Sequence, residues 1–284
     1  MEKRILCYTD FSENAQNAID YAIQLYDKQT CTFYFLNAFQ ADADASDIEA
    51  LIPDLENDIY ISEKKTSEAG LNKIIQTIAS NSKNNKHSYK MISSYNALLF
   101  ALKEAIKTNA IDLLVIGAKN ALDDQENKNI PTLDIMEYIT ECSILAVPRD
   151  FKFCSLKEIV LPVNYEEVLH ETSFLELLNL ANLYNTEVQI LHIKKEHNLD
   201  DNQLENKTKL EHIFKGLTCN FHSLERMNVN KGIISFVENE RCNLIAFIGE
   251  QSNYIGNDLP KPLLKELDTH LSLPVWLINT IGLK

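Results

Sequence analysis

The chain has 284 residues, 45% of them hydrophobic and 24% charged, which excludes a disordered or fibrous protein and predicts two domains of ordinary size. Its formal net charge is −14 at pH 7, with 23 acidic against 14 basic residues in 1–150 and 18 against 13 in 151–284. Because both halves are negative, they repel phosphate backbones and anionic lipids, so neither nucleic acid nor a membrane is expected as a partner.

No apolar run approaches the roughly 18 residues that a membrane helix needs, and residues 1–4 lead directly into an apparent strand. We therefore expect a cytoplasmic protein. The six cysteines are scattered without a C-x-x-C pair, which is typical of reduced core thiols rather than of disulfides or a zinc site. They are Cys7, Cys31, Cys142, Cys154, Cys219 and Cys242.

The first elements predict a β-α-β unit. Residues 5–8 form a short apolar run, Ser12 is a suitable N-cap, and apolar side chains recur at 3.6-residue spacing over 15–26. Residues 32–39 are almost continuously apolar, which is typical of a strand that is buried on both faces of a parallel sheet.

The same alternation continues to residue 147. It predicts three more helices and three more strands, so that five strands alternate with four helices in the first half. Such an order indicates an open, doubly wound parallel sheet of the α/β class. The predicted helices centre on 71–79, 97–105 and 133–139, and the predicted strands cover 87–93, 112–117 and 143–147.

The second half repeats this order of elements. Residues 158–163 and 187–193 match the first two strands, and 243–249 matches 112–117 with one extra residue. We therefore expect two tandem doubly wound domains, each with a five-stranded parallel sheet, at 1–150 and 158–284. The short linker 151–157 is expected to hold them close together.

The first copy holds an acidic insertion between its second and third strands. It coincides with residues 40–60, which contain seven carboxylates. The hypothesis for this stretch is a solvated surface loop with a helical turn. A cation site is the alternative, although the D-x-D-x-D-G pattern of calcium loops is missing.

Each half resembles a universal stress protein domain, and the similarity covers essentially the whole chain. Three segments carry it: RILCYTDFS at 4–12, the strand 112–117 that ends in a glycine, and the last helix that leads to CSILAVP at 142–148. The family has a Rossmann-like fold, and its members commonly occur as tandem pairs. The resemblance therefore implies a tandem member with a role in stress response.

In that family, adenine nucleotide binds at the carboxyl ends of the strands, where an aspartate follows the first strand. A loop of the form G-x2-G-x9-G-[ST] wraps the phosphates with its backbone amides. Carried onto the first half, the aspartate is Asp10 and the first glycine is Gly117. The second glycine position holds Asn120, and Thr132 meets the hydroxyl position only after a one-residue shift.

The rest of the first loop departs from the pattern. Ile130 stands at the third glycine position and Pro131 at the Ser/Thr position, so close approach to phosphate is blocked and one amide donor is missing. The carboxylates of Asp123, Asp124 and Glu126 add repulsion. This implies a degenerate ATP-binding motif.

The second half departs further. Asn164 replaces the aspartate and Gly249 is present, but Ser252, Pro262 and Leu263 occupy the other loop positions. Gly256 lies out of register with the family's loop. A nucleotide site is therefore expected in the first half only, if at all.

Two functions follow from this pattern. The first is a non-enzymatic stress-response or regulatory protein without cofactor, which binds protein partners or itself through its sheet edges. The alternative is an ATP-binding sensor or slow ATPase with one pocket lined by Asp10, Gly117, Asn120 and Thr132. A turn or cap role for Asp10 is the structural alternative to nucleotide binding, and a different small ligand in the clefts stays open.

No catalytic or metal-binding set is expected. The histidines form no H-x3-H pair, and the Walker, G-x-G-x-x-G and G-x-S-x-G motifs are missing from the sequence. Cys7 and Cys31 lie in neighbouring predicted strands, which stand about 5 Å apart, so a redox pair is one further alternative. Pairing of 143–147 with 274–278 within one chain is expected from the resemblance, because family members often pair through their last strands.

Overall fold

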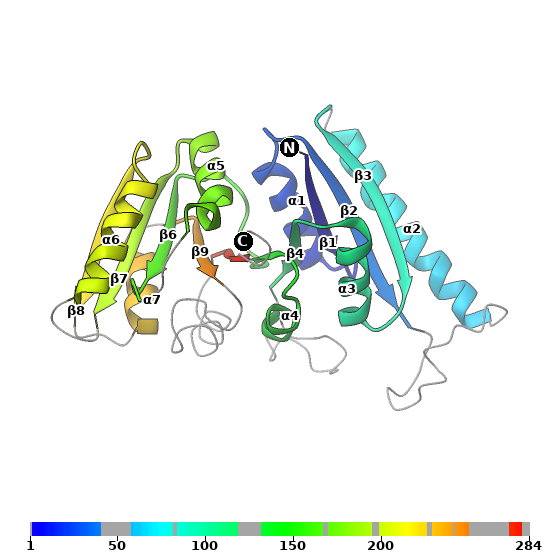
Figure 1. Ribbon diagram of the computed structural model, residues 1–284. Helices are drawn as coiled ribbons and strands as arrows, with labels where there is room; N and C mark the ends of the chain where they lie inside the picture. Colours follow the sequence, from blue (N-terminus) through cyan, green and yellow to red (C-terminus); the bar gives the residue numbers. More distant parts are fainter. Residues whose placement is uncertain are drawn as a thin grey trace. The chain divides into compact units, whose positions relative to one another are not determined.

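The computed structural model describes residues 2–40, 58–81, 84–118, 132–166, 170–194, 199–225, 229–240, 242–249 and 273–279. The chain forms two compact units, Met1–Gly117 and Ala118–Lys284. Figure 1 shows strands alternating with helices in each of them.

The described residues of the first unit form four strands and three helices in strict alternation. Its apolar runs become strands because they are buried, as in β2, whose first seven residues are all buried. The predicted N-cap is confirmed, since the amide of Ala15 donates to Oγ of Ser12 at 3.2 Å. The elements are β1 Lys3–Tyr8, α1 Glu13–Leu25, β2 Cys31–Phe39, α2 Asp58–Asn81, β3 His87–Tyr95, α3 Leu98–Asn109 and β4 Leu113–Gly117.

The sheet of the first unit has the order β3-β2-β1-β4, and its neighbouring strands are parallel. Helices α1 and α2 cover one face and α3 covers the other, so the strands lie in the middle layer (Figure 1). This is the doubly wound arrangement predicted from the alternation. Its strands all end at one edge, which is where open α/β sheets bind ligands.

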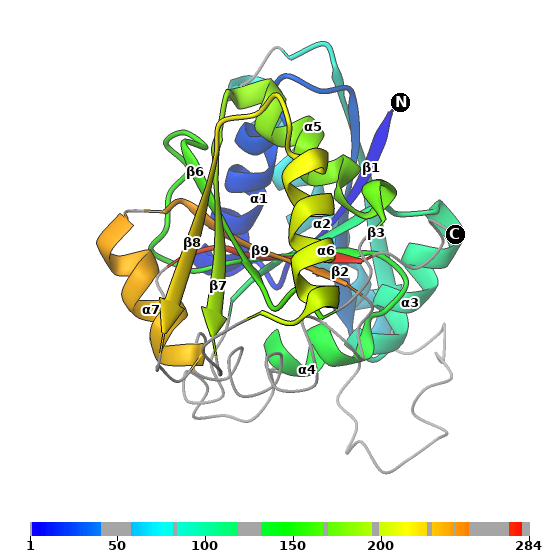
Figure 2. The same ribbon diagram turned by 60° about the vertical axis from the view of Figure 1, so that its left-hand side comes forward.

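Six strands lie among the described residues of the second unit. Figure 2 shows that α6 and α7 lie on opposite sides of β7 and β8. Its elements are α4 Thr132–Tyr138, β5 Ser143–Val147, β6 Glu158–Val163, the 3₁₀ turn Glu171–Phe174, α5 Leu175–Tyr184, β7 Glu187–Lys194, α6 Asp201–Ile213, β8 Cys219–Glu225, α7 Val229–Glu240, β9 Leu244–Gly249 and β10 Val275–Asn279.

The six strands have the order β5-β10-β9-β6-β7-β8. Strand β10 runs parallel to β9 but antiparallel to β5, with Trp276 opposite Leu145. The expected pairing of the two closing strands within one chain is therefore confirmed. Trp276 is the single tryptophan and is 1% exposed.

The α/β class and the alternation are confirmed. The domain boundaries at 150 and 158 follow the sequence repeat and stay a prediction, while the compact units divide after Gly117 because β5 pairs with β10. The segment 151–157 contains neither helix nor strand. None of the helices in the described part of the chain is long and apolar enough to cross a membrane.

The redox alternative for Cys7 and Cys31 is wrong. Strands β1 and β2 do pair, but Cys7 lies opposite Phe35, four residues beyond Cys31 in the register. Four residues of strand span about 13 Å, which is far beyond disulfide reach. Burial also raises the pKa of both thiols, that of Cys31 to about 12.

Candidate functional site

The candidate site of the first unit lies at the carboxyl ends of β1 and β4. The register places Cys7 opposite Val115, so the chain that follows each strand emerges at the same level. The structure thus brings Asp10 and Gly117 to one edge of the sheet. Asn120 lies outside the described residues, and Thr132 is a buried residue of the second unit at the start of α4.

The Asp10 carboxylate closes the turn between β1 and α1. Its Oδ1 accepts hydrogen bonds from the amide of Ser12 at 3.1 Å and from the hydroxyl of Ser12 at 2.6 Å. The same hydroxyl oxygen accepts from Ala15 and so caps α1. One carboxylate oxygen is therefore occupied by the fold, which is the structural role that was the alternative for Asp10.

Phe11 makes a sharp corner after Asp10. Its φ is 64°, which is unusual for a residue with a side chain and costs about 1–2 kcal/mol. The ring lies against Gly70 of α2, where an added Cβ would be 2.5 Å from Cε1 of the ring. The amide of Phe11 donates to Oγ1 of Thr9, and Asn37 Nδ2 donates to the Thr9 carbonyl at 2.8 Å. The two hydrogen bonds hold the strained corner in place.

The second unit has the same corner after β6. Tyr165 takes the place of Phe11, and its φ is 59°. Nδ1 of His192 on β7 donates to the Val163 carbonyl at 2.8 Å, which reproduces the bond from Asn37 to Thr9 in the first unit. The equivalence extends the sequence repeat to backbone conformation.

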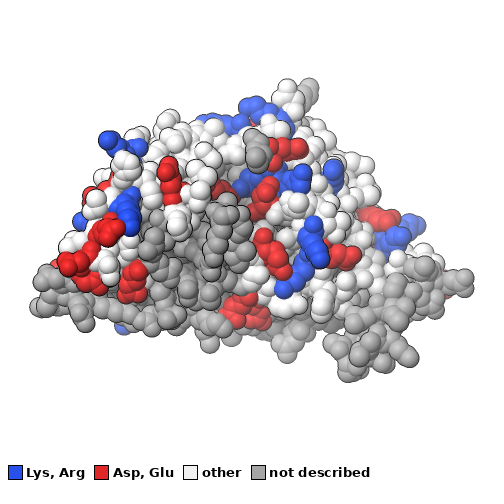
Figure 3. Space-filling model, viewed as in Figure 1, with Lys and Arg blue, Asp and Glu red and all other residues white. Residues whose placement is uncertain are grey.

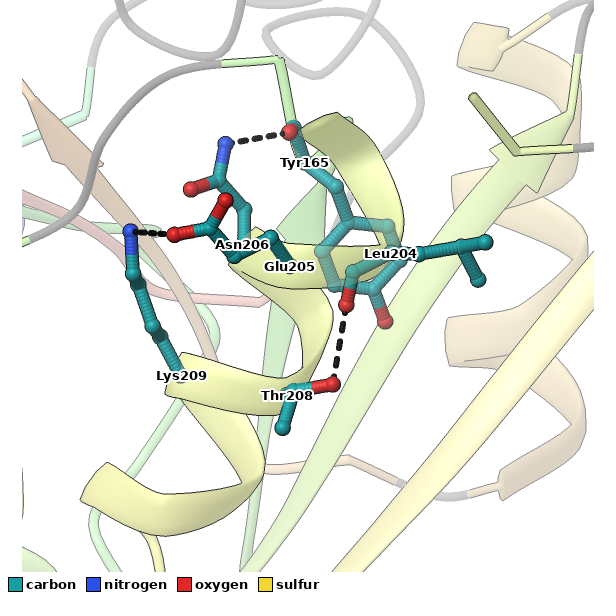
Figure 4. A network of polar contacts seen from close by, with 6 residues as sticks. All are labelled: Tyr165, Leu204, Glu205, Asn206, Thr208 and Lys209. Carbon is teal, nitrogen blue, oxygen red and sulfur yellow. Dashed lines mark hydrogen bonds and ion pairs between the residues drawn. The ribbon is translucent and has the colours of Figure 1, made fainter. Parts of the chain in front are cut away.

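The corner of the second unit is closed by its own side chains. Tyr165 is 3% exposed, whereas Phe11 is 40% exposed. The Tyr165 and His192 rings have centroids 4.8 Å apart. Figure 4 shows the hydrogen bond that Nδ2 of Asn206 on α6 donates to the Tyr165 carbonyl at 2.9 Å. Nε2 of Gln203 binds the Asn164 carbonyl at 3.1 Å. Helix α6 and strand β7 thus hold the turn after β6, which would face a ligand, through side-chain hydrogen bonds and ring packing.

The two strand-end glycines are Gly117 and Gly249. At Gly117 the need for glycine is steric, because an added Cβ would lie 2.8 Å from Cγ of Asn14 and 3.0 Å from its backbone carbon. Strand β4 therefore packs closely on α1. The remaining loop positions of both copies, 119–131 and 250–272, lie outside the described residues.

No group of three or more His, Cys, Asp or Glu side chains in the described part of the chain is arranged to hold a metal ion. Desolvation, with the Asp10 carboxylate adding, raises the pKa of Tyr8, so that phenol stays protonated at neutral pH.

Sequence reasoning missed the residues that close the second corner. Gln203 and Asp200 form a capping box, whose D-x-x-Q spacing was readable at the start of α6. Nothing in the sequence marked Tyr165, His192 and Asn206 as partners, because their contacts join three separate elements.

Comparison with known proteins identifies the fold. No known protein family profile matches the chain, and no curated protein matches its sequence. A universal stress protein from Archaeoglobus fulgidus has a similar structure, with a TM-score of 0.66, 14% identity, and coverage of 97% of this chain and 98% of that one. The chain therefore has the tandem fold of universal stress proteins.

Two further structures share this architecture. One comes from Pseudomonas aeruginosa and carries the same family name, with a TM-score of 0.56, 12% identity and coverage of 98% and 93%. The other is the cytoplasmic domain of a prokaryotic cation chloride cotransporter, with a TM-score of 0.54, 9% identity and coverage of 98% and 96%. At such identities the likeness extends to the fold alone.

Proposed function

We propose that the chain is a non-enzymatic regulatory protein of the universal stress type, which acts in the cytoplasm by binding protein partners or further copies of itself. The observation that carries this proposal is that side chains of the protein itself occupy the turns after β1 and β6. One oxygen of Asp10 is occupied by the turn, and Tyr165 fills the corner of the second unit. These side chains contribute to the fold at the edge where nucleotide would bind.

The outer strands β3 and β8 support association through the sheet edges. Each ends its sheet and so presents backbone donors and acceptors on one side. Met91 on β3 is 44% exposed, which adds apolar surface to that edge. On the face seen in Figure 3, acidic and basic side chains of the described residues are interspersed, which favours a protein partner over a polyanion.

Phosphate release from ATP tests the absence of turnover. The purified protein is expected to release no phosphate above the buffer background over hours. Steady release that follows the protein concentration would contradict the non-enzymatic proposal.

The alternative is an ATP-binding sensor or slow ATPase with one pocket in the first unit. Asp10 and Gly117 at one edge and the exposed ring of Phe11 favour it. If this alternative holds, Asp10→Asn is expected to weaken ATP binding by about tenfold or more, since it removes a charge-assisted hydrogen bond.

Calorimetric titration of ATP with magnesium measures that affinity. The matched control is Asp20→Asn, because Asp20 is exposed on α1 and accepts from Gln16 within the same helix. Equal affinities of the Asp10 variant and the wild type would remove Asp10 from the pocket.

A further inference from the structure

Three carboxylates gather at the amino-terminal edge of the sheet in the second unit. Glu158 and Glu187 begin β6 and β7 and are register partners. Neighbouring strands stand about 4.8 Å apart, and partners in a parallel pair point to the same face. Glu240 is the last residue of α7. Burial raises the pKa of Cys242 to about 12, and Glu158 and then Glu240 add to this rise, so both carboxylates lie near that thiol.

Helix α7 covers this face of the sheet. The centroid of its Phe236 ring lies 4.8 Å from the centroid of the His222 ring on β8. Nε2 of His222 donates to Oε1 of Gln189 at 2.8 Å, and the amide of Gln189 hydrogen-bonds to Glu158. Asn220 donates to Gln189 and to Glu187. A polar chain therefore runs across three strands beneath α7 and ends on the carboxylates.

Within the described part of the chain, the three carboxylates have no cationic partner. Among the described residues no ion pair involves Glu158, Glu187 or Glu240. Oε2 of Glu158 is buried and has no hydrogen-bond partner there. Desolvation raises the pKa of Glu158, and Glu187 and Glu240 raise it further, while the bond from Gln189 lowers it.

We propose that this cluster is a proton-sensitive latch between α7 and the sheet of the second unit. A proton on Glu158 lets its carboxyl group lie beside that of Glu187 beneath α7. When that proton leaves, the charges of Glu158, Glu187 and Glu240 repel one another and the end of α7 loosens. Cys242 lies near Glu158 and Glu240, His222 lies on the same face beneath α7, and Arg241 lies outside the described residues.

The sign of the pH effect follows from the raised pKa of Glu158. Glu158 binds its proton more tightly in the folded state than in the unfolded chain, where glutamates titrate at about pH 4.3. The stability that the latch contributes is therefore fully present below that pH and is lost as the pH rises through the raised value. Mild acid tightens the second unit.

The first test is the melting temperature of the full chain between about pH 4 and pH 8. Glu158→Gln imitates the protonated form, so at neutral pH it is expected to raise Tm by about 1–2 °C, a small shift because solvent screens these groups. The gain is expected to vanish near pH 4. Glu238→Gln is the matched control, because Glu238 is an exposed residue of the same helix. Parallel Tm profiles for Glu158→Gln and the wild type would overturn the latch.

The second test reads α7 directly by hydrogen exchange, corrected for the intrinsic effect of pH on exchange. In the wild type, amides of 229–240 are expected to exchange several-fold faster at neutral pH than at about pH 5, whereas Glu158→Gln and Glu240→Gln keep the slower rate. Protection of α7 that does not depend on pH in the wild type would also overturn the proposal.

Discussion

Tyr165→Ala is expected to destabilise the second unit by about 3–5 kcal/mol, because it empties a buried aromatic site. The ring is 3% exposed and packs on His192. Loss of the ring also removes the contacts that offset the energetic cost of the left-handed backbone conformation at Tyr165. The turn after β6 then keeps its polar bonds from α6 and β7 but loses the packing of the ring.

Urea unfolding followed by the fluorescence of Trp276 measures this effect, since the single tryptophan lies in the same unit. Tyr165→Phe is the matched control and is expected to cost about 1 kcal/mol or less, because it keeps the ring. If Tyr165→Ala cost no more than Tyr165→Phe, the ring would not close the corner and the contrast between the two units would fail.

Gly117→Ala is expected to destabilise the first unit by about 1–3 kcal/mol through overpacking. The added Cβ would lie 2.8 Å from Cγ of Asn14 and 3.0 Å from its backbone carbon, so the backbone of α1 itself would have to shift. The effect is independent of nucleotide. Thermal unfolding followed by far-ultraviolet circular dichroism measures it.

Gly70→Ala is the matched control for this change. Its Cβ meets only the tip of the Phe11 ring, which is partly exposed and free to turn outward. Alanine is also favoured over glycine in a helix by about 1 kcal/mol, so the net change is expected to be small. If Gly117→Ala had the same Tm as the wild type, packing against Asn14 would not require glycine at this position. A role of Gly117 in binding phosphate would then be favoured.

The strands and helices could be predicted because their signals are local. The apolar run of β2 and the cap at Ser12 both depend on neighbours in sequence, and both formed as expected. The repeat then placed the second set of strands, and the pairing of β5 with β10 followed from the resemblance.

The strand-end corners could not be predicted. The positive φ of Phe11 and Tyr165 leaves no mark in the sequence, and it is stabilised by residues that lie far along the chain, such as Asn37 and His192. Register is equally hidden, which is why the proximity expected for Cys7 and Cys31 was wrong. The sequence thus predicted that Asp10 and Gly117 lie at one edge of the sheet, but the partners of the residues at that edge required the structure.

The nucleotide content of the purified protein is the direct test of the proposed role without a cofactor. The purified chain is denatured, its supernatant is separated by chromatography for adenine nucleotide, and the intact protein is titrated with ATP and magnesium by calorimetry. The proposed role without a cofactor predicts no bound nucleotide and no binding heat up to about 1 mM ATP. A binding free energy of about −4 kcal/mol or weaker corresponds to that limit. About one equivalent per chain with micromolar or tighter affinity would contradict this role and establish a nucleotide-binding sensor instead.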